Sequence, residues 1–160
     1  MRSVKINNTL KYHPDYKCHR EVVQQVYDML QIAMEHIDKY FELPDTINVL
    51  LVPLKGNTNG RWVDTKKTMH IDPRVTNKGR NLGSILSTFV HELAHAEQYR
   101  QGRLTYKQGT YVWNKTDTIR RCKSITFNRY YNLPWEIEAR EKQDTITPLL
   151  TLDIVNNASK

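Results

Sequence analysis

The segment FVHELAHAEQY, at residues 89–99, carries two histidines four positions apart and a glutamate directly after the first of them. In an α-helix, residues four apart lie one above the other on the same face, so the imidazoles of His91 and His95 can approach one metal ion. Glu92 lies about 100° further round such a helix, where its carboxylate can accept a proton from water next to the metal. This is the H-E-x-x-H pattern, which predicts a Zn²⁺ site with His91 and His95 as ligands and Glu92 as the general base.

A third protein ligand is expected outside this segment, because a hydrolytic zinc site usually has three protein ligands and one open position. The strongest source is YYNLPWEIEAREKQ, at residues 130–143, in which Pro134 suits the first turn of a helix. Glu136 and Glu138 would point roughly 200° apart on that helix, so only one of them can reach the metal. We expect Glu138 to be the ligand, because the small Ala139 beside it would let the two helices approach closely.

The elements that would position these residues follow from the hydrophobic pattern. It predicts, in order, a long helix, a buried strand, a hairpin and a second long helix, at residues 16–41, 46–54, 61–73 and 81–101. Together with the third-ligand helix, these elements indicate an α+β fold with a small mixed sheet, in which residues 1–160 form a single domain. We expect the strand at Met69–Ile71 to form the sheet edge along which an extended peptide pairs.

The segment between the two ligand helices, residues 103–131, is basic and aromatic and reads as a hairpin about WNK followed by an irregular linker. Its mixture of cations and rings suits contact with a nucleic-acid backbone and base stacking, for which Arg120, Arg121 and Lys123 are the candidate residues. It would equally suit an acidic protein partner, or an insertion that forms a solvated flap over the cleft.

The composition limits where the protein can act. The formal net charge of +7 suggests affinity for something anionic. The longest mostly apolar run, INVLLVPL, is too short to span a bilayer, and the first residues lack the apolar stretch of a signal peptide. Two cysteines make no disulfide framework. We therefore expect a cytoplasmic protein without membrane association.

HELAH, followed some forty residues later by LPWEIEAR, resembles the gluzincin branch of the zinc metallopeptidases. More closely, it is similar to the minimal-domain zincins of bacteria and their phages, a kind that includes the ImmA/IrrE group. The resemblance implies His91 and His95 as zinc ligands, Glu138 as the third ligand and Glu92 as the base. If the protein comes from a phage, the resemblance implies that it is located in the cytoplasm of the infected host cell.

The sequence departs from the thermolysin-like form of this branch at one position. An aspartate four residues beyond the third ligand orients a histidine in that form, and Lys142 stands there in this chain. Glu141 or Asp117 are the alternatives for this orienting role.

The resemblance implies a zinc-dependent metallopeptidase that hydrolyses peptide bonds in a protein or peptide substrate. Its tetrahedral intermediate needs a hydrogen-bond donor, for which Tyr111, Tyr130 and Tyr131 are candidates. The alternative is a regulatory or nucleic-acid-associated binding protein that keeps the zincin shape with little hydrolysis. The intact Glu92 favours the enzyme, because a pure binding module has no need of a general base.

Overall fold

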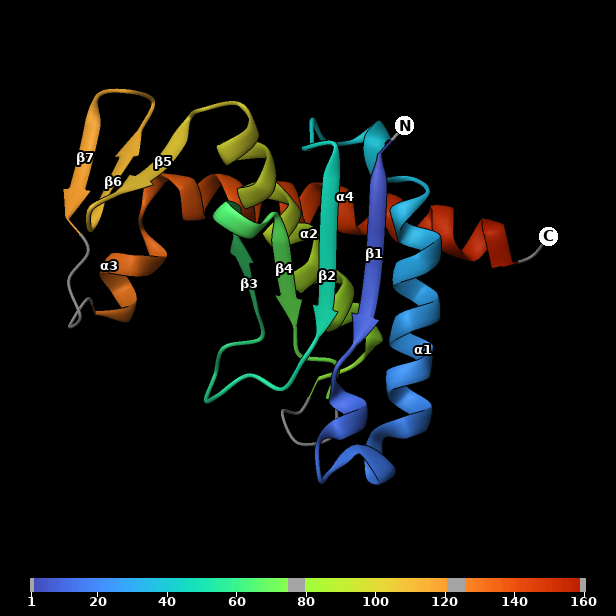
Figure 1. Cartoon of the computed structure of the whole chain (residues 1–160). Helices are drawn as coiled ribbons and strands as arrows, with labels where there is room; N and C mark the ends of the chain where they lie inside the picture. Colours follow the sequence, from blue (N-terminus) through green and yellow to red (C-terminus); the bar gives the residue numbers. More distant parts are fainter. Residues whose placement is uncertain (1, 75–79, 121–125, 159–160) are drawn as a thin grey trace.

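The computed structural model describes residues 2–74, 80–120 and 126–158, and it has an α+β fold (Figure 1). A four-stranded mixed sheet has the strand order β1-β2-β4-β3. Its strands are β1 (Ser3–Asn8), β2 (Thr46–Leu51), β3 (Gly60–Val63) and β4 (Thr68–Ile71). β1, β2 and β4 are parallel, whereas β3 is antiparallel to β4 and lies at the edge of the sheet. The edge strand is therefore β3, and the expectation that Met69–Ile71 would form this edge was wrong.

Three long helices form the layer that packs on this sheet, namely α1 (Tyr16–Met34), α2 (Leu82–Arg100) and α4 (Pro134–Ala158). α2 contacts β3, β4 and α4, while α1 contacts β1 and both other helices. In Figure 1 the strands pass in front of α2 and α4, and α1 flanks β1. Short 3₁₀ turns at Leu10–Tyr12, Ile37–Lys39 and Asp64–Lys66 complete this part of the fold.

The main core lies between the sheet and the helices because the strand pattern directs apolar residues to that face. Ile47, Val49 and Leu51 alternate along β2 and are fully buried. They meet fully buried residues of α2 such as Phe89 and Leu93. The histidine-bearing helix is thus fixed by its apolar side, which leaves its polar stripe for chemistry.

A second, three-stranded antiparallel sheet follows α2 and projects beyond β3 in Figure 1. It consists of β5 (Leu104–Lys107), β6 (Thr110–Trp113) and β7 (Asp117–Arg120), and α3 (Phe127–Tyr131) leads from it to α4. The expected hairpin about WNK is confirmed, because β6 and β7 pair across it. Leu104 and Trp113 pack with Leu133 and Trp135 in a small core of their own, which ties this sheet to the start of α4.

Several boundaries differ from the expected ones. The first helix ends at Met34 instead of residue 41, and α4 continues to Ala158, beyond the expected 143, with Pro148 inside it. The strand β1 was not expected at all. Only Ile6 of its six residues is buried, so it lacks the apolar alternation that marks a strand in sequence. None of the described helices combines the length and the apolar character that crossing a membrane requires.

Candidate metal centre

Three side chains from α2 and α4 meet at one point. The Nε2 atom of His91 lies 3.1 Å from one carboxylate oxygen of Glu136, and the Nε2 atom of His95 lies 3.2 Å from the other. The two Nε2 atoms are 3.2 Å apart. Among the described residues this is the cluster of histidine, cysteine and carboxylate side chains whose ligand atoms lie close enough to share one metal ion.

The spacing of these atoms matches what zinc requires. Zinc binds nitrogen and oxygen ligands tetrahedrally at about 2.0–2.2 Å, which places neighbouring ligand atoms about 3.3 Å apart. The two Nε2 atoms, 3.2 Å apart, fall within about 0.2 Å of that value, and each lies 3.1–3.2 Å from a different carboxylate oxygen of Glu136. The site is also largely removed from solvent, with Glu136 and His95 both buried. The residues therefore fit a zinc ion with three protein ligands.

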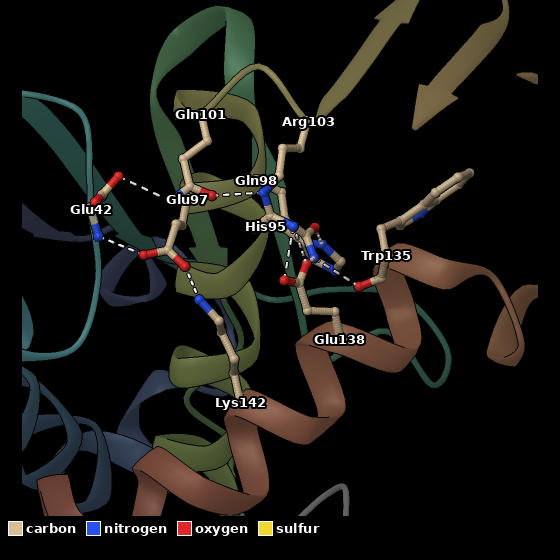
Figure 2. Close-up of polar contacts among 9 residues, drawn as sticks. All are labelled: Glu42, His95, Glu97, Gln98, Gln101, Arg103, Trp135, Glu138 and Lys142. Atoms are coloured by element: carbon tan, nitrogen blue, oxygen red, sulfur yellow. Dashed lines mark hydrogen bonds and ion pairs between the residues drawn. The ribbon is translucent and has the colours of Figure 1, made fainter. Parts of the chain in front are cut away.

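The structure brings Glu136 to the two histidines, and it places the expected third ligand, Glu138, away from them. Ala139 does mark the side of α4 that packs on α2, since it is fully buried. However, the residue that shares its face is Glu136, three positions earlier, whereas the neighbouring Glu138 lies about 100° round the helix. Glu138 instead accepts hydrogen bonds from Arg103 and Gln98 (Figure 2).

The residues that hold the two histidines are glutamines. The Nδ1 atom of His95 lies 2.9 Å from Oε1 of Gln98, and the Nδ1 atom of His91 lies 3.1 Å from Oε1 of Gln143. Partners of this kind orient ligand histidines in metal sites. Sequence reasoning missed both glutamines, although Gln98 follows His95 by three positions on the same helix face.

Of the two alternatives named for this orienting role, the described residues include the side chain of Glu141 alone. Glu141 is exposed, and the side chain of Asp117 lies outside the described residues. Lys142 makes an ion pair with the buried carboxylate of Glu97 on α2 (Figure 2). It therefore connects the two helices without contacting a histidine.

Glu92 is placed beside the histidine pair by the edge strand β3. Its carboxylate accepts a hydrogen bond from the backbone N–H of Trp62. Gly60 allows this approach, because a Cβ atom at that position would lie only 3.2 Å from Cγ of Glu92. Burial raises the pKa of the Glu92 carboxyl, and the charges of His95 and His91 act in the opposite direction. A carboxyl with a raised pKa next to a metal centre suits a proton acceptor that must later give the proton up.

The charges of the three clustered side chains depend on one another. Burial opposes charge on His95, but the hydrogen bond and the negative charge of Glu136 outweigh it and raise the pKa of His95 to about 9. Burial likewise opposes charge on Glu136, whose hydrogen bonds to His91 and His95 nevertheless hold its pKa far below the usual range. Without metal, Glu136 is thus ionised and its negative charge favours the protonated form of His95.

A cavity of about 470 Å³ opens beside His91 and Glu92. Its lining presents both polar and apolar surface and comes from β3 and the loop before it, from α2, α3 and α4: Asn57, Thr58, Asn59, Gly60, Thr88, His91, Glu92, Phe127, Tyr130 and Gln143. A cavity of this size can hold a few atoms of an extended chain or one side chain of a substrate.

The three candidate tyrosines have separate positions. Tyr130 lines the cavity, and partial burial together with the charge and hydrogen bond of Glu136 raises the pKa of its phenol, which therefore keeps its proton. Tyr111 packs against Trp135, with ring centroids 5.2 Å apart. Tyr131 stacks on Phe127 at 5.5 Å and lies under the guanidinium of Arg140. Tyr130 is thus the candidate that combines a place in the cavity with a proton to donate.

The basic candidates of the 103–131 segment are only partly described. The backbone of Arg120 belongs to β7, while Arg121 and Lys123 lie outside the described residues. Several aromatic residues of this segment are exposed, namely Tyr106, Phe127, Tyr130 and Tyr131. Tyr106 and Tyr111 pair across β5 and β6 on one face, and the ring of Tyr111 packs on the start of α4.

Comparisons of the chain with protein-family models, with curated proteins and with solved structures find no match. The assignment of a function therefore depends on the residues of the site itself.

Proposed function

We propose that this protein is a zinc-dependent hydrolase that cleaves peptide bonds, with His91, His95 and Glu136 as metal ligands and Glu92 as the general base. The observation that carries the proposal is the convergence of His91, His95 and Glu136, with the two Nε2 atoms 3.2 Å apart and each of them 3.1–3.2 Å from a different carboxylate oxygen of Glu136. Hydrogen bonding alone gives little reason to bring two imidazoles and a carboxylate to one point in a buried site. The shape that best fits this arrangement is a minimal zincin-like domain of the gluzincin kind.

In the proposed hydrolysis, Glu92 and Tyr130 would have separate roles beside the metal. Zinc, when bound, acidifies water and polarises a carbonyl group. Glu92 would accept the proton of the attacking water and pass it to the departing amine, a role that its raised pKa favours. Tyr130 would donate its hydroxyl proton in a hydrogen bond to the developing oxyanion.

The substrate proposed for this site is an extended peptide that lies along β3. No other strand of the described residues pairs with the outer edge of β3, which leaves backbone groups there for a further strand. The same strand holds Glu92 through the N–H of Trp62, so a peptide paired with it would pass close to the base.

The test compares the wild type with Glu92→Gln at equal zinc occupancy against a broad library of peptides. The substitution keeps the size of the side chain and leaves all three ligands unchanged, so zinc content and fold should persist. Turnover should fall by about 10²–10⁴-fold, as is typical when a general base is lost. Equal turnover in the two proteins, or no turnover by zinc-loaded wild type, would favour a binding protein in place of a hydrolase.

A further inference from the structure

A continuous chain of hydrogen bonds leads from His95 to the base of the second sheet (Figure 2). Nδ1 of His95 lies 2.9 Å from Oε1 of Gln98. The Nε2 group of Gln98 donates to the carbonyl of Trp135 at 2.9 Å and to the carboxylate of Glu138 at 2.8 Å. That carboxylate in turn accepts from Nη1 of Arg103, at 2.8 and 2.9 Å to its two oxygens. Two side chains, those of Gln98 and Glu138, thus connect a proposed ligand to the cation of Arg103, which itself touches no part of the metal site.

The acceptors around Gln98 fix which way its amide points. A backbone carbonyl and a carboxylate can only accept hydrogen bonds, so the edge of the amide that faces Trp135 and Glu138 must be its NH₂ group. The oxygen of the amide then faces His95, and an oxygen there can only accept. Gln98 is 1 % exposed, so water offers no alternative partner.

This orientation determines the form of His95. An accepting oxygen at 2.9 Å from Nδ1 requires that Nδ1 carry the proton. When the ring is neutral, its lone pair is then on Nε2, the atom that points to Glu136 and His91. If the amide were reversed, its NH₂ group would face Nδ1 and would favour the tautomer that is protonated at Nε2. A protonated Nε2 cannot bind a metal.

Arg103 is itself held firmly by the second sheet. Its backbone N–H donates to the carbonyl of Gln98, and its carbonyl accepts from the N–H of Asn114 at the end of β6. Its guanidinium lies 5.2 Å from the ring centroid of Trp113. The position of the cation therefore depends on the three-stranded sheet, and so does the carboxylate that it pairs with.

We infer that Gln98 is a positioning residue that keeps His95 in its metal-binding form, and that the Arg103–Glu138 ion pair holds Gln98 in the orientation this requires. This gives the second sheet a role at the metal centre, because Asn114 and Trp113 at the end of β6 contact Arg103, which directly precedes β5. The inference rests on the proposed function, since it assigns a partner to one of the proposed zinc ligands.

The chain offers a matched control in the same helix pair. Lys142 on α4 and Glu97 on α2 form an ion pair whose carboxylate is buried and also accepts from the N–H of Glu42 at 2.6 Å (Figure 2). This pair joins α2 to α4 as the Glu138 contact does, but it touches no ligand. Its loss should lower stability without changing the geometry of His95.

The experiment measures zinc affinity by competition with a chromogenic chelator in the wild type, Gln98→Leu, Glu138→Leu, Glu138→Gln and Lys142→Met, with the folded fraction checked by circular dichroism. Gln98→Leu should weaken zinc binding by about 10–100-fold, the usual effect of losing a partner of a ligand histidine. Glu138→Leu should also weaken zinc binding, but by less than Gln98→Leu, because the carbonyl of Trp135 still accepts a hydrogen bond from the amide of Gln98. Glu138→Gln should recover only part of the affinity, because its amide oxygen can accept from Gln98 but no longer forms the ion pair with Arg103. Lys142→Met should lower the melting temperature and leave zinc affinity unchanged.

A second measurement needs no metal. In the metal-free wild type and in Glu138→Gln, at a pH high enough for the ring to be neutral, nuclear magnetic resonance should place the ring proton of His95 on Nδ1, and Gln98→Leu should lose this preference. Wild-type zinc affinity in Gln98→Leu with an unchanged Nδ1–H signal would overturn the inference. So would a loss of zinc affinity in Lys142→Met as large as that in Glu138→Leu. If the wild type binds no zinc while the Nδ1–H signals behave as expected, the positioning of His95 stands and the proposed function falls.

Discussion

Replacing Gly60 with alanine is expected to destabilise the protein and to disturb Glu92. A Cβ atom at this position would lie 2.6 Å from Cγ2 of Thr88 on α2, and 3.2 Å from both Cγ of Glu92 and Cδ1 of Ile71. Ordinary carbon contacts lie at about 3.5–4.0 Å, so Thr88 presents the severe clash. The methyl group of Thr88 cannot simply rotate away, because its hydroxyl donates to the carbonyl of Ser84 and accepts from Arg80.

The size of the effect follows from these contacts. Either β3 moves away from α2, or Thr88 gives up its two hydrogen bonds. Overpacking of this kind costs about 1–3 kcal/mol of unfolding free energy. In a chain of 160 residues, that loss corresponds to a fall of about 3–10 °C in the melting temperature. If the protein is a hydrolase, turnover should fall further than zinc affinity, because Glu92 is displaced and the ligands are not.

Chemical denaturation of Gly60→Ala, Thr88→Ser and the double variant tests this reasoning. Serine keeps the Oγ1 hydrogen bonds of Thr88 and removes the methyl group that meets the new Cβ. Thr88→Ser alone should cost less than about 1 kcal/mol, and in the double variant it should recover most of the stability lost in Gly60→Ala. The reasoning would be refuted if Gly60→Ala unfolded at the wild-type denaturant concentration, or if serine at position 88 gave no recovery.

Three further predictions follow from the site. Glu136→Ala should abolish tight zinc binding, while Glu138→Ala should only weaken it; equilibrium dialysis with the opposite ranking would restore Glu138 as the ligand. Because zinc must displace a proton from His95, whose pKa is about 9 without metal, zinc affinity should rise by up to about tenfold per pH unit up to that value. In the metal-free protein, the raised pKa of His95 means that its protonated form adds to the free energy of unfolding. This contribution is fully present below pH ~6.5, and chemical denaturation should show it disappearing as the pH rises through about 9. Tyr130→Phe should lower the turnover number at equal zinc occupancy; an equal turnover number would remove Tyr130 from the mechanism.

The local part of the site could be predicted from the sequence, because helix geometry alone determines it. His91 and His95 face one point since they are four residues apart on a helix that apolar residues bury on its other side. The same rule, applied to α4, would have chosen Glu136, which shares a face with the buried Ala139. Gln143 lies seven residues after Glu136, two turns along that face, so it too left a signal in the sequence.

The contacts that depend on the sheet could not be predicted in the same way. Gly60 and Trp62 lie about thirty residues before Glu92 in the sequence, and nothing in their local pattern indicates that β3 runs beside α2. The strand β1 pairs through backbone groups with β2 and buries one side chain, so its sequence carries almost no periodic signal. Such contacts are set by the packing of distant elements, which the structure provides.

The central claim is that His91, His95 and Glu136 bind one zinc ion, and X-ray absorption at the zinc edge tests it most directly. Wild-type protein loaded with one equivalent of zinc should show nitrogen and oxygen ligands only, at about 2.0–2.2 Å, with the scattering pattern of two imidazoles. His91→Ala and His95→Ala should each remove one imidazole from that pattern. Zinc surrounded by six water oxygens, or a spectrum that neither substitution changes, would contradict the account.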